Sequence, residues 1–145
     1  MQKRLALTLL VFSLTFPAFA KEGWGTDYKA ALEQAAEKNK PVLLEFTGSD
    51  WCPPCKKLSA DVFSKPEFQK FAQENLVLVE LDFPNNKPQS DALKKQNQML
   101  AQKFGVEGYP TVVLLNSKGK EVAREVGYQP GGPKAFIKWV ESSLE

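Results

Sequence analysis

Three apolar runs along the chain have the length and composition of buried β-strands. They cover residues 42–47, 76–83 and 111–115, and polar or turn-forming residues bound each of them. Short runs this apolar are typical of strands that are covered on both faces. A fourth strand is expected at 121–126, because the turn sequence at 116–119 would join it to the third run as a hairpin.

Between these runs the apolar residues recur at helical spacing. The pattern predicts a helix before the first strand (28–36), one that begins at Pro53, one at 93–104 and one at 133–144. The order helix, strand, helix, strand, helix, hairpin, helix is typical of an α/β domain. It predicts a mixed sheet of four strands, or five, with helices on both faces and a right-handed parallel crossover between the first two strands.

The helix that begins at Pro53 is expected to be interrupted or bent at Pro66, since proline has no N–H and clashes with the preceding turn. Ser64 and Glu67 have the spacing of a capping box, which predicts that Ser64 caps the segment that follows.

The first twenty residues have the layout of a secretory signal peptide rather than of a folded segment. A basic start at residues 3–4 precedes an apolar run at 5–16 that is too short to span a bilayer, and small residues at 17–20 supply a cleavage site. Cleavage is expected after Ala20, which would leave 21–145 as one domain. We expect a periplasmic protein, or a secreted one if the source has no outer membrane. The alternative is an uncleaved membrane anchor.

The charges of the chain argue against some classes of partner. It carries 19 Lys and Arg residues against 17 Asp and Glu, and it has no His. Two of the basic residues lie in the predicted signal peptide, so the exported part should be net neutral. No Lys or Arg cluster remains there, which argues against nucleic acid and against an anionic membrane surface. The mature form is expected not to be membrane-inserted, and for one chain formed of short local units a monomer is the expected state.

The chain has two cysteines, Cys52 and Cys55, where the first strand gives way to a helical pattern. As a structural disulfide the pair would contribute little, because closing a loop of four residues stabilises a fold by only about 2 kcal/mol. A structural zinc site needs four ligands, and the chain has no His and no third Cys. Haem attachment would require His where Lys56 stands. Redox chemistry and a structural disulfide remain, and neither a metal nor a cofactor is expected.

Two motifs resemble those of the thioredoxin family. The segment 51–55 (Trp-Cys-Pro-Pro-Cys) stands at a predicted helix start, and 108–111 (Gly-Tyr-Pro-Thr) precedes the predicted hairpin. The resemblance covers nearly all of the exported part. The segment 108–111 is similar to that of protein disulfide isomerase domains, while the exported start and the segment 50–55 resemble small exported bacterial thioredoxin-like thiol–disulfide oxidoreductases. The resemblance implies a thioredoxin fold and redox exchange with the thiols and disulfides of exported proteins. It also implies a cis Tyr109–Pro110 bond that faces the cysteine pair.

The cysteines can be given roles from their positions. Thiolate is the attacking species in disulfide exchange, and a helix N-terminus stabilises its charge. Cys52 occupies that place and is the predicted nucleophile, while Cys55, one turn later, is predicted to attack the mixed disulfide and close the Cys52–Cys55 bond. Pro110 is expected to present the backbone of Tyr109 to an extended substrate. The alternative for Pro110 is an ordinary proline at a strand start.

Glu45 is an ionisable residue in an otherwise apolar strand. If it is buried, a raised pKa suits it to accept the proton of Cys55. It resembles the buried acid of thioredoxins, although the turn to Cys52 is one residue longer here. The lysine that often accompanies that acid is not evident at 78–82. The alternative is an exposed carboxylate at the strand end.

A substrate groove is expected around the cysteines. Trp51 should shield one side of the site, whereas Trp24 and Trp139 are interpreted as packing residues. Each aromatic side chain of the groove is as well suited to the core. The residues expected to border the groove are Trp51, Phe83, Tyr109, Gly127 and Tyr128.

The direction of electron flow depends on how strongly the thiolate is stabilised. The chain has no His to favour the thiolate, and Pro53 and Pro54 remove two N–H donors from the helix start. Both features favour a reductase, and isomerase activity is compatible with the same chemistry. Such a reductase would need a membrane-bound thiol electron donor. The alternative is a non-catalytic protein-binding or chaperone module with a permanently oxidised pair.

Overall fold

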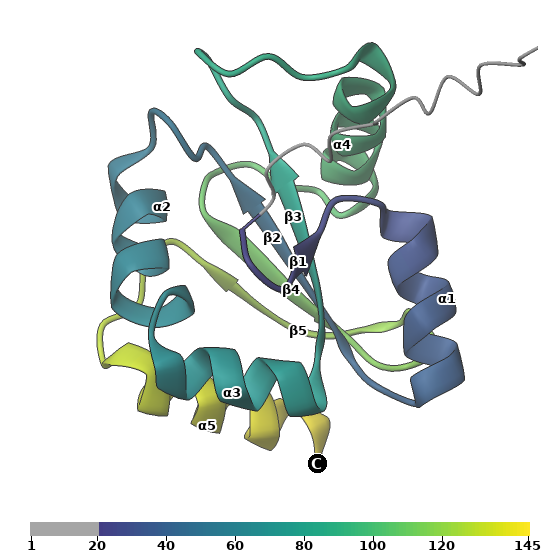
Figure 1. Cartoon of the computed structure of the whole chain (residues 1–145), viewed down its shortest axis with the longest axis vertical. Coiled ribbons are helices and arrows are strands. Elements are labelled where there is room, and N and C mark those ends of the chain that lie inside the picture. Colours follow the sequence, from purple (N-terminus) through teal and green to yellow (C-terminus); the bar gives the residue numbers. More distant parts are fainter. Residues whose placement is uncertain (1–20) are drawn as a thin grey trace, which may run out of the picture.

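The computed structural model describes residues 21–145, so the predicted signal peptide and its cleavage lie outside the described residues. One sheet runs through this part of the chain in the order β1-β3-β2-β4-β5 (Figure 1). The first three of these strands are parallel, and β4 and β5 are antiparallel to their neighbours. The strands are β1 (Trp24–Gly25), β2 (Val42–Thr47), β3 (Val77–Asp82), β4 (Thr111–Leu115) and β5 (Glu121–Val126). The predicted mixed α/β sheet is confirmed, with the two-residue β1 as its fifth strand.

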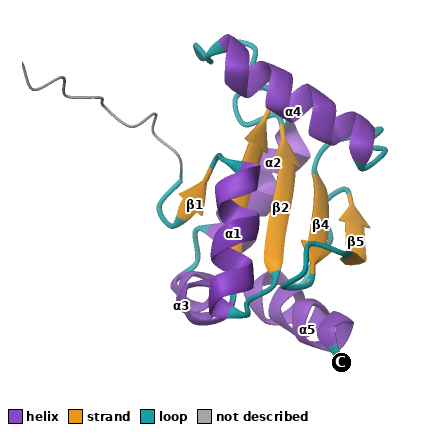
Figure 2. Cartoon of the chain, turned by 90° about the vertical axis from the view of Figure 1, so that its right-hand side faces the viewer, coloured by secondary structure: helices purple, strands orange, loops and turns teal. Residues whose placement is uncertain are grey.

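Helices cover both faces of the sheet (Figures 1 and 2). On one face lie α1 and α4, and on the other lie α2, α3 and α5, with a π-helical turn η1 between α2 and α3. Their bounds are α1 (Tyr28–Lys38), α2 (Pro53–Leu58), η1 (Ser59–Phe63), α3 (Pro66–Asn75), α4 (Asp91–Lys103) and α5 (Gly132–Leu144).

Alternate residues of β2 face two separate cores. Val42, Leu44 and Phe46 pack with residues of α1 and α4. Leu43 packs instead with residues of α2, η1, α3 and α5. Because side chains alternate along a strand, Glu45 shares the face of Leu43 and points toward the helix that carries the cysteines. Trp24 and Trp139 pack in this second core, as predicted.

The long helix after the cysteines is broken where Pro66 stands, as predicted, since α3 begins there. The predicted capping box is wrong. Lys65 occupies the N-cap position of α3 and makes no side-chain cap, while Ser64 Oγ donates to the carbonyl oxygen of Ala60 at 3.0 Å. Ser64 keeps helical backbone angles (φ −82°, ψ −7°), so Lys65 and not Ser64 takes the extended conformation of an N-cap residue. The π-helical turn, Ser59–Phe63, was not predicted.

The other helices begin and end at residues suited to those places. Asp27 Oδ1 accepts from the Ala30 amide at 3.0 Å at the start of α1, and Asn39 closes it with a left-handed φ of 51°. Ser90 Oγ accepts from the Leu93 amide at 3.2 Å at the start of α4. These caps set where α1 and α4 begin, and packing of both helices against β2 places them over the face of the sheet opposite the cysteines.

Candidate active site

The cysteine pair lies where β2 ends and α2 begins. Cys52 is the N-cap residue of α2, and its Sγ accepts from the Cys55 amide at 3.4 Å. The two sulfurs form a disulfide. Pro53 and Pro54 fill the first two helical positions and have no N–H, so the Cys55 amide is the first donor of this helix. Cys52 and Cys55 are only 3% and 1% exposed.

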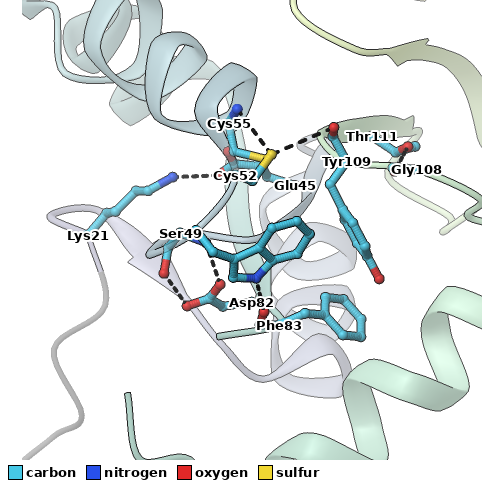
Figure 3. The surroundings of a disulfide bond; sticks show 11 residues. Lys21, Glu45, Ser49, Cys52, Cys55, Asp82, Phe83, Gly108, Tyr109 and Thr111 are labelled. Carbon is cyan, nitrogen blue, oxygen red and sulfur yellow. Dashed lines mark hydrogen bonds and ion pairs between the residues drawn. A yellow bond between two sulfur atoms is a disulfide. The ribbon is translucent and has the colours of Figure 1, made fainter. Parts of the chain in front are cut away.

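The segment before β4 faces the disulfide (Figure 3). The Tyr109–Pro110 peptide bond is cis, as predicted. The carbonyl oxygen of Tyr109 lies 3.7 Å from Cys52 Sγ. Two further bonds hold this segment: Thr111 Oγ1 donates to Gly108 O at 2.7 Å, and the Gly127 amide donates to Pro110 O at 2.8 Å. The motif at 108–111 thus places a backbone acceptor beside the sulfur.

Three aromatic residues form a rim on one side of the pair. Trp51 is 41% exposed, and its Nε1 donates to the carbonyl oxygen of Phe83 at 2.7 Å. The Tyr109 ring meets Trp51 edge-on with 5.9 Å between centroids, and lies 5.1 Å from the Phe83 ring. Phe83 and Tyr109 are also packed against the core on the α1 side. Of the three, Trp51 is the one that presents a largely free surface.

The turn that leads into the cysteines is bonded to the end of β3 and the loop after it. The Ser49 amide and Oγ both donate to the Asp82 carboxylate, at 2.9 and 2.5 Å. Asp50 accepts from the amides of Asn85 and Asn86, at 3.0 and 2.6 Å. These backbone donors, Asn85 first, hold the Asp50 pKa below its usual value. The turn is therefore held from two sides.

Glu45 is fully buried beneath the cysteine-bearing helix, so the alternative of an exposed carboxylate is wrong (Figure 3). Loss of hydration on burial raises its pKa to about 7, against an ordinary value of 4.5, although the positive charge of Lys21 offsets part of that rise. Its Oε1 has no hydrogen-bond partner within the described residues. The group can therefore bind and release a proton near neutral pH.

The cation beside Glu45 is Lys21, which the sequence reading missed. Lys21 Nζ lies 2.5 Å from Glu45 Oε2 and 3.1 Å from Glu80 Oε2. Residues 78–82 contain no lysine, and the structure supplies the cation instead from the segment before β1. The available signal was Glu80 itself, because a second acid in a buried strand next to that of Glu45 favours a cation nearby.

Gly127 and Tyr128 lie where β5 leads toward α5. Gly127 has a left-handed φ of 79° and bonds to Pro110, which places it beside the cis bond. Tyr128 packs against the core on the α2 side, and its hydroxyl donates to Asp61 of η1 at 2.7 Å. Its structural contacts therefore tie this loop to the helix that follows the cysteines.

Among residues 21–145 no group of three or more His, Cys, Asp and Glu side chains is arranged to hold a metal ion. Over the same residues no helix is long and apolar enough to cross a membrane.

Comparison with known proteins identifies the fold. A family model described as a thioredoxin-like domain matches residues 28–143. The chain belongs to the thioredoxin-like family. The bonded Cys-x-x-Cys pair, the cis proline and the strands β2 to β5 lie within the matched residues, whereas β1 precedes them.

Several relatives carry names from disulfide chemistry. The disulfide bond reductase DsbH of Chlamydia pneumoniae is 39% identical over 118 residues, a match that covers 81% of this chain and 70% of DsbH. The thioredoxin-related protein DsbJ of the same organism is 35% identical over 126 residues, covering 81% of this chain and 36% of DsbJ. The thiol:disulfide interchange protein DsbD of Klebsiella pneumoniae is 36% identical over 104 residues, covering 72% of this chain but only 16% of DsbD.

Solved structures agree with these relatives. A DsbH oxidoreductase superposes with a TM-score of 0.77 at 35% identity, covering 88% of this chain and 90% of the other. The reduced C-terminal domain of DsbD from Neisseria meningitidis gives a TM-score of 0.61 at 29% identity, covering 79% and 92%. With the bonded cysteine pair, these similarities make the chain a thiol–disulfide oxidoreductase related to DsbH.

Proposed function

We propose that this protein is a disulfide reductase that is exported and acts on exported proteins, with isomerase activity as a secondary reaction of the same site. Residues 1–20 are its cleaved signal peptide and 21–145 its single mature domain. The observation that carries the proposal is the placement of Cys52 at the N-cap of α2, bonded to Cys55 one turn later. The name of the relative DsbH, a disulfide bond reductase, supports the direction.

The reaction transfers two electrons from the cysteine pair to a substrate disulfide. The Cys52 thiolate attacks one substrate sulfur, and the other substrate sulfur leaves as a thiolate. Cys55 gives its proton to Glu45 and attacks Cys52 Sγ. The mixed disulfide breaks, the Cys52–Cys55 bond forms, and the second substrate thiolate leaves. A membrane-bound thiol donor must then reduce the pair again.

The segment next to the pair is suited to an extended substrate. The Tyr109 carbonyl points at Cys52 and is held there by the bonds of the cis-proline segment. A substrate strand that pairs with this backbone would bring its sulfur to Cys52. Trp51, Tyr109, Gly127 and Tyr128 border the groove in this proposal, and the exposed Trp51 indole supplies its apolar side.

The proposed direction of electron flow, from the cysteine pair to the substrate, rests on how few groups can stabilise the Cys52 thiolate. The Cys55 amide donates to Cys52 Sγ, while Pro53 and Pro54 offer no donor and the chain has no His. A weakly stabilised thiolate gives a more reducing couple. We expect a potential closer to that of thioredoxin, about −270 mV, than to that of the strong oxidase DsbA, about −120 mV.

The decisive experiment is insulin reduction by dithiothreitol, with wild-type protein and Cys52→Ser. Wild type should accelerate the reaction and Cys52→Ser should not. Absence of acceleration by wild type would favour a binding module with a permanently oxidised pair. A glutathione redox series gives the potential, and a value near that of DsbA would refute the direction. Cys55→Ser should trap substrates as mixed disulfides in the exported fraction.

The role of Glu45 has its own test. In wild type the step in which Cys55 resolves a mixed disulfide should slow as pH falls below about 7, because the protonated carboxyl cannot accept a proton. Glu45→Gln should be slow at every pH and lose this inflection. Resolution at the wild-type rate across pH would remove Glu45 from the mechanism.

A further inference from the structure

The loop between β5 and α5 needs outside contacts to keep one conformation. It spans residues 127–131, and both Gly127 and Gly131 have left-handed φ angles, of 79° and 123°. Glycine loses more conformational freedom than any other residue when its backbone becomes fixed. One contact is at the start of the loop, where the Gly127 amide donates to the Pro110 carbonyl at 2.8 Å. This bond holds the start of the loop beside the cis-proline segment and leaves the rest of it to other contacts.

The side chain of Tyr128 provides the second contact, with the helical segment that follows the cysteines. Its ring packs against the core on the α2 side, and its hydroxyl donates to Asp61 Oδ2 at 2.7 Å. Lys57 Nζ lies 3.0 Å from the same oxygen and 5.2 Å from the centroid of the Tyr128 ring. The bond from Tyr128, and then the one from Lys57, hold the Asp61 pKa below its usual value, so the acceptor is a carboxylate at neutral pH. The loop thus lies against α2 and η1 (Figure 1).

Asp61 reaches Tyr128 from the π-helical turn η1. The Ser64 amide donates to the Ser59 carbonyl at 2.8 Å, five residues back, whereas an α-helical amide donates four residues back. The turn therefore holds one extra residue, and it carries the half-exposed Asp61 on its outer side while Val62 and Phe63 face the core. Such turns are rare and occur frequently at functional sites. Here the turn presents a carboxylate to the loop that starts beside the cis bond.

Tyr128 and the aromatic rim lie on opposite faces of the sheet. Phe83 and Tyr109 of the rim pack against the core on the α1 side, whereas Tyr128 packs against the core on the α2 side. The Tyr109 carbonyl lies between these faces, 3.7 Å from Cys52 Sγ and just before β4. Side chains alternate along a strand, so those of a substrate strand that pairs with this segment would point in turn toward the rim and toward the loop after β5. The loop is therefore placed to contact an extended substrate.

We propose, on the basis of the reductase function proposed above, that Asp61 is a positioning residue for protein substrates. Through its bond to Tyr128 it fixes the loop after β5 as the second wall of the substrate groove, opposite the aromatic rim. Without that bond the loop must be ordered each time a substrate strand binds, and this cost weakens binding. A small disulfide that meets only Cys52 does not use the wall. Loss of the Asp61–Tyr128 bond should therefore raise the KM for a protein disulfide.

The test compares a protein disulfide with a small one. Insulin reduction by dithiothreitol gives KM and kcat, and the chromogenic disulfide dithiobis(nitrobenzoate) gives the rate at which Cys52 attacks in the reduced protein. Asp61→Ala should raise the KM for insulin several-fold with little change in kcat, and the attack on the small disulfide should slow far less. Tyr128→Phe removes the same bond but keeps the ring, so it should have a similar effect, and it serves if Asp61→Ala folds poorly. The double variant should be no worse than either single variant, because both remove one bond.

Two controls accompany these variants. Asp61→Asn keeps an oxygen that can accept from Tyr128 and should recover most of the wild-type KM. Glu121→Gln breaks the ion pair with Arg124 at the far end of β5 and should leave both reactions unchanged. A wild-type KM in both Asp61→Ala and Tyr128→Phe would overturn the role of Asp61 alone, as would an equal loss of rate with both disulfides. Wild-type protein that does not reduce insulin would overturn the proposed function and this inference with it.

Discussion

Glu45 makes the stability of the protein depend on pH. Its pKa in the folded state, about 7, lies above the ordinary 4.5. A group with a raised folded pKa stabilises the fold fully below the unfolded pKa, and that contribution is lost as pH rises through the folded value. The difference corresponds to about 3 kcal/mol of stability lost by pH 8.

Glu45→Gln should therefore stabilise the oxidised protein at pH 8 by about 2 kcal/mol more than at pH 5, since an amide mimics the neutral carboxyl. Urea unfolding at the two pH values measures this. The exposed acid Glu107 provides the control, and Glu107→Gln should change stability equally at both. A gain from Glu45→Gln that is the same at pH 5 and pH 8 would contradict the buried, titrating acid.

Glycine is required at position 48 because of the adjacent Trp51 side chain, and not because of the backbone conformation there. A Cβ at this position would clash with the indole of Trp51. Gly48→Ala should therefore displace the indole, break its bond to the Phe83 carbonyl and lower the insulin reduction rate several-fold. Tryptophan fluorescence reports the displacement. In Gly25→Ala, the control, the added methyl meets only the Leu78 carbonyl at 3.6 Å, so spectrum and rate should stay as in wild type. Unchanged fluorescence in Gly48→Ala would mean that the ring is not packed there.

At the scale of elements, the pattern of apolar residues predicted four of the five strands, and the two-residue β1 was not among them. The predicted strand at 76–83 is observed as Val77–Asp82, and the predicted hairpin is formed by β4 and β5. The π-helical turn and the failed cap at Ser64 were not predictable, because both depend on which carbonyl a side chain or amide reaches once the helix has packed.

The site was predictable only where local sequence determines it. A helix start at Pro53 places the cysteines, whereas the cis bond before β4 was expected only from the resemblance to the thioredoxin family. Lys21 could not be found this way, because its partners lie far along the chain and meet it only when the short β1 pairs with β3. Long-range pairing of charges has no signature in local periodicity.

The loop after β3 should depend on a single carboxylate. Asp50→Ala removes the acceptor of the Asn85 and Asn86 amides, so hydrogen exchange at both should become several-fold faster. The Asn116 amide bonds to Lys120 across the distant hairpin and serves as the internal control. Because the Asp50 pKa is lowered in the folded protein, its contribution is present above the unfolded pKa and is lost as pH falls through the folded one. Unaltered hydrogen exchange in Asp50→Ala would show that the loop is ordered without the hydrogen bonds to Asp50.

At the scale of the whole molecule, one edge of the sheet gathers the chemistry. The parallel strands β2 and β3 end there, and β4 starts there because it runs the opposite way. The cysteines, the Asp82 carboxylate that binds Ser49, and the cis proline therefore lie close together although they are far apart in sequence (Figure 3). Glu45 and Lys21 lie buried or half-buried next to this edge, under the helix that carries the cysteines. The aromatic rim of Trp51, Phe83 and Tyr109 lies on the other side of the cysteine pair.

The proposed direction of electron flow predicts which redox state of the whole molecule is more stable. In the strong oxidase DsbA the reduced form is stabilised, and the span from its potential to that of thioredoxin, about 150 mV, corresponds to about 7 kcal/mol. Here few groups stabilise the Cys52 thiolate. The disulfide lowers the conformational entropy of the unfolded chain, which stabilises the folded state by about 2 kcal/mol. The oxidised form should therefore be more stable than the reduced form by about 2 kcal/mol or more in urea unfolding with and without dithiothreitol. Cys52→Ser should show no dependence on the reductant. If the free energy of unfolding were larger for the reduced form than for the oxidised form, the folded protein would stabilise the thiolate. The protein would then be an oxidase.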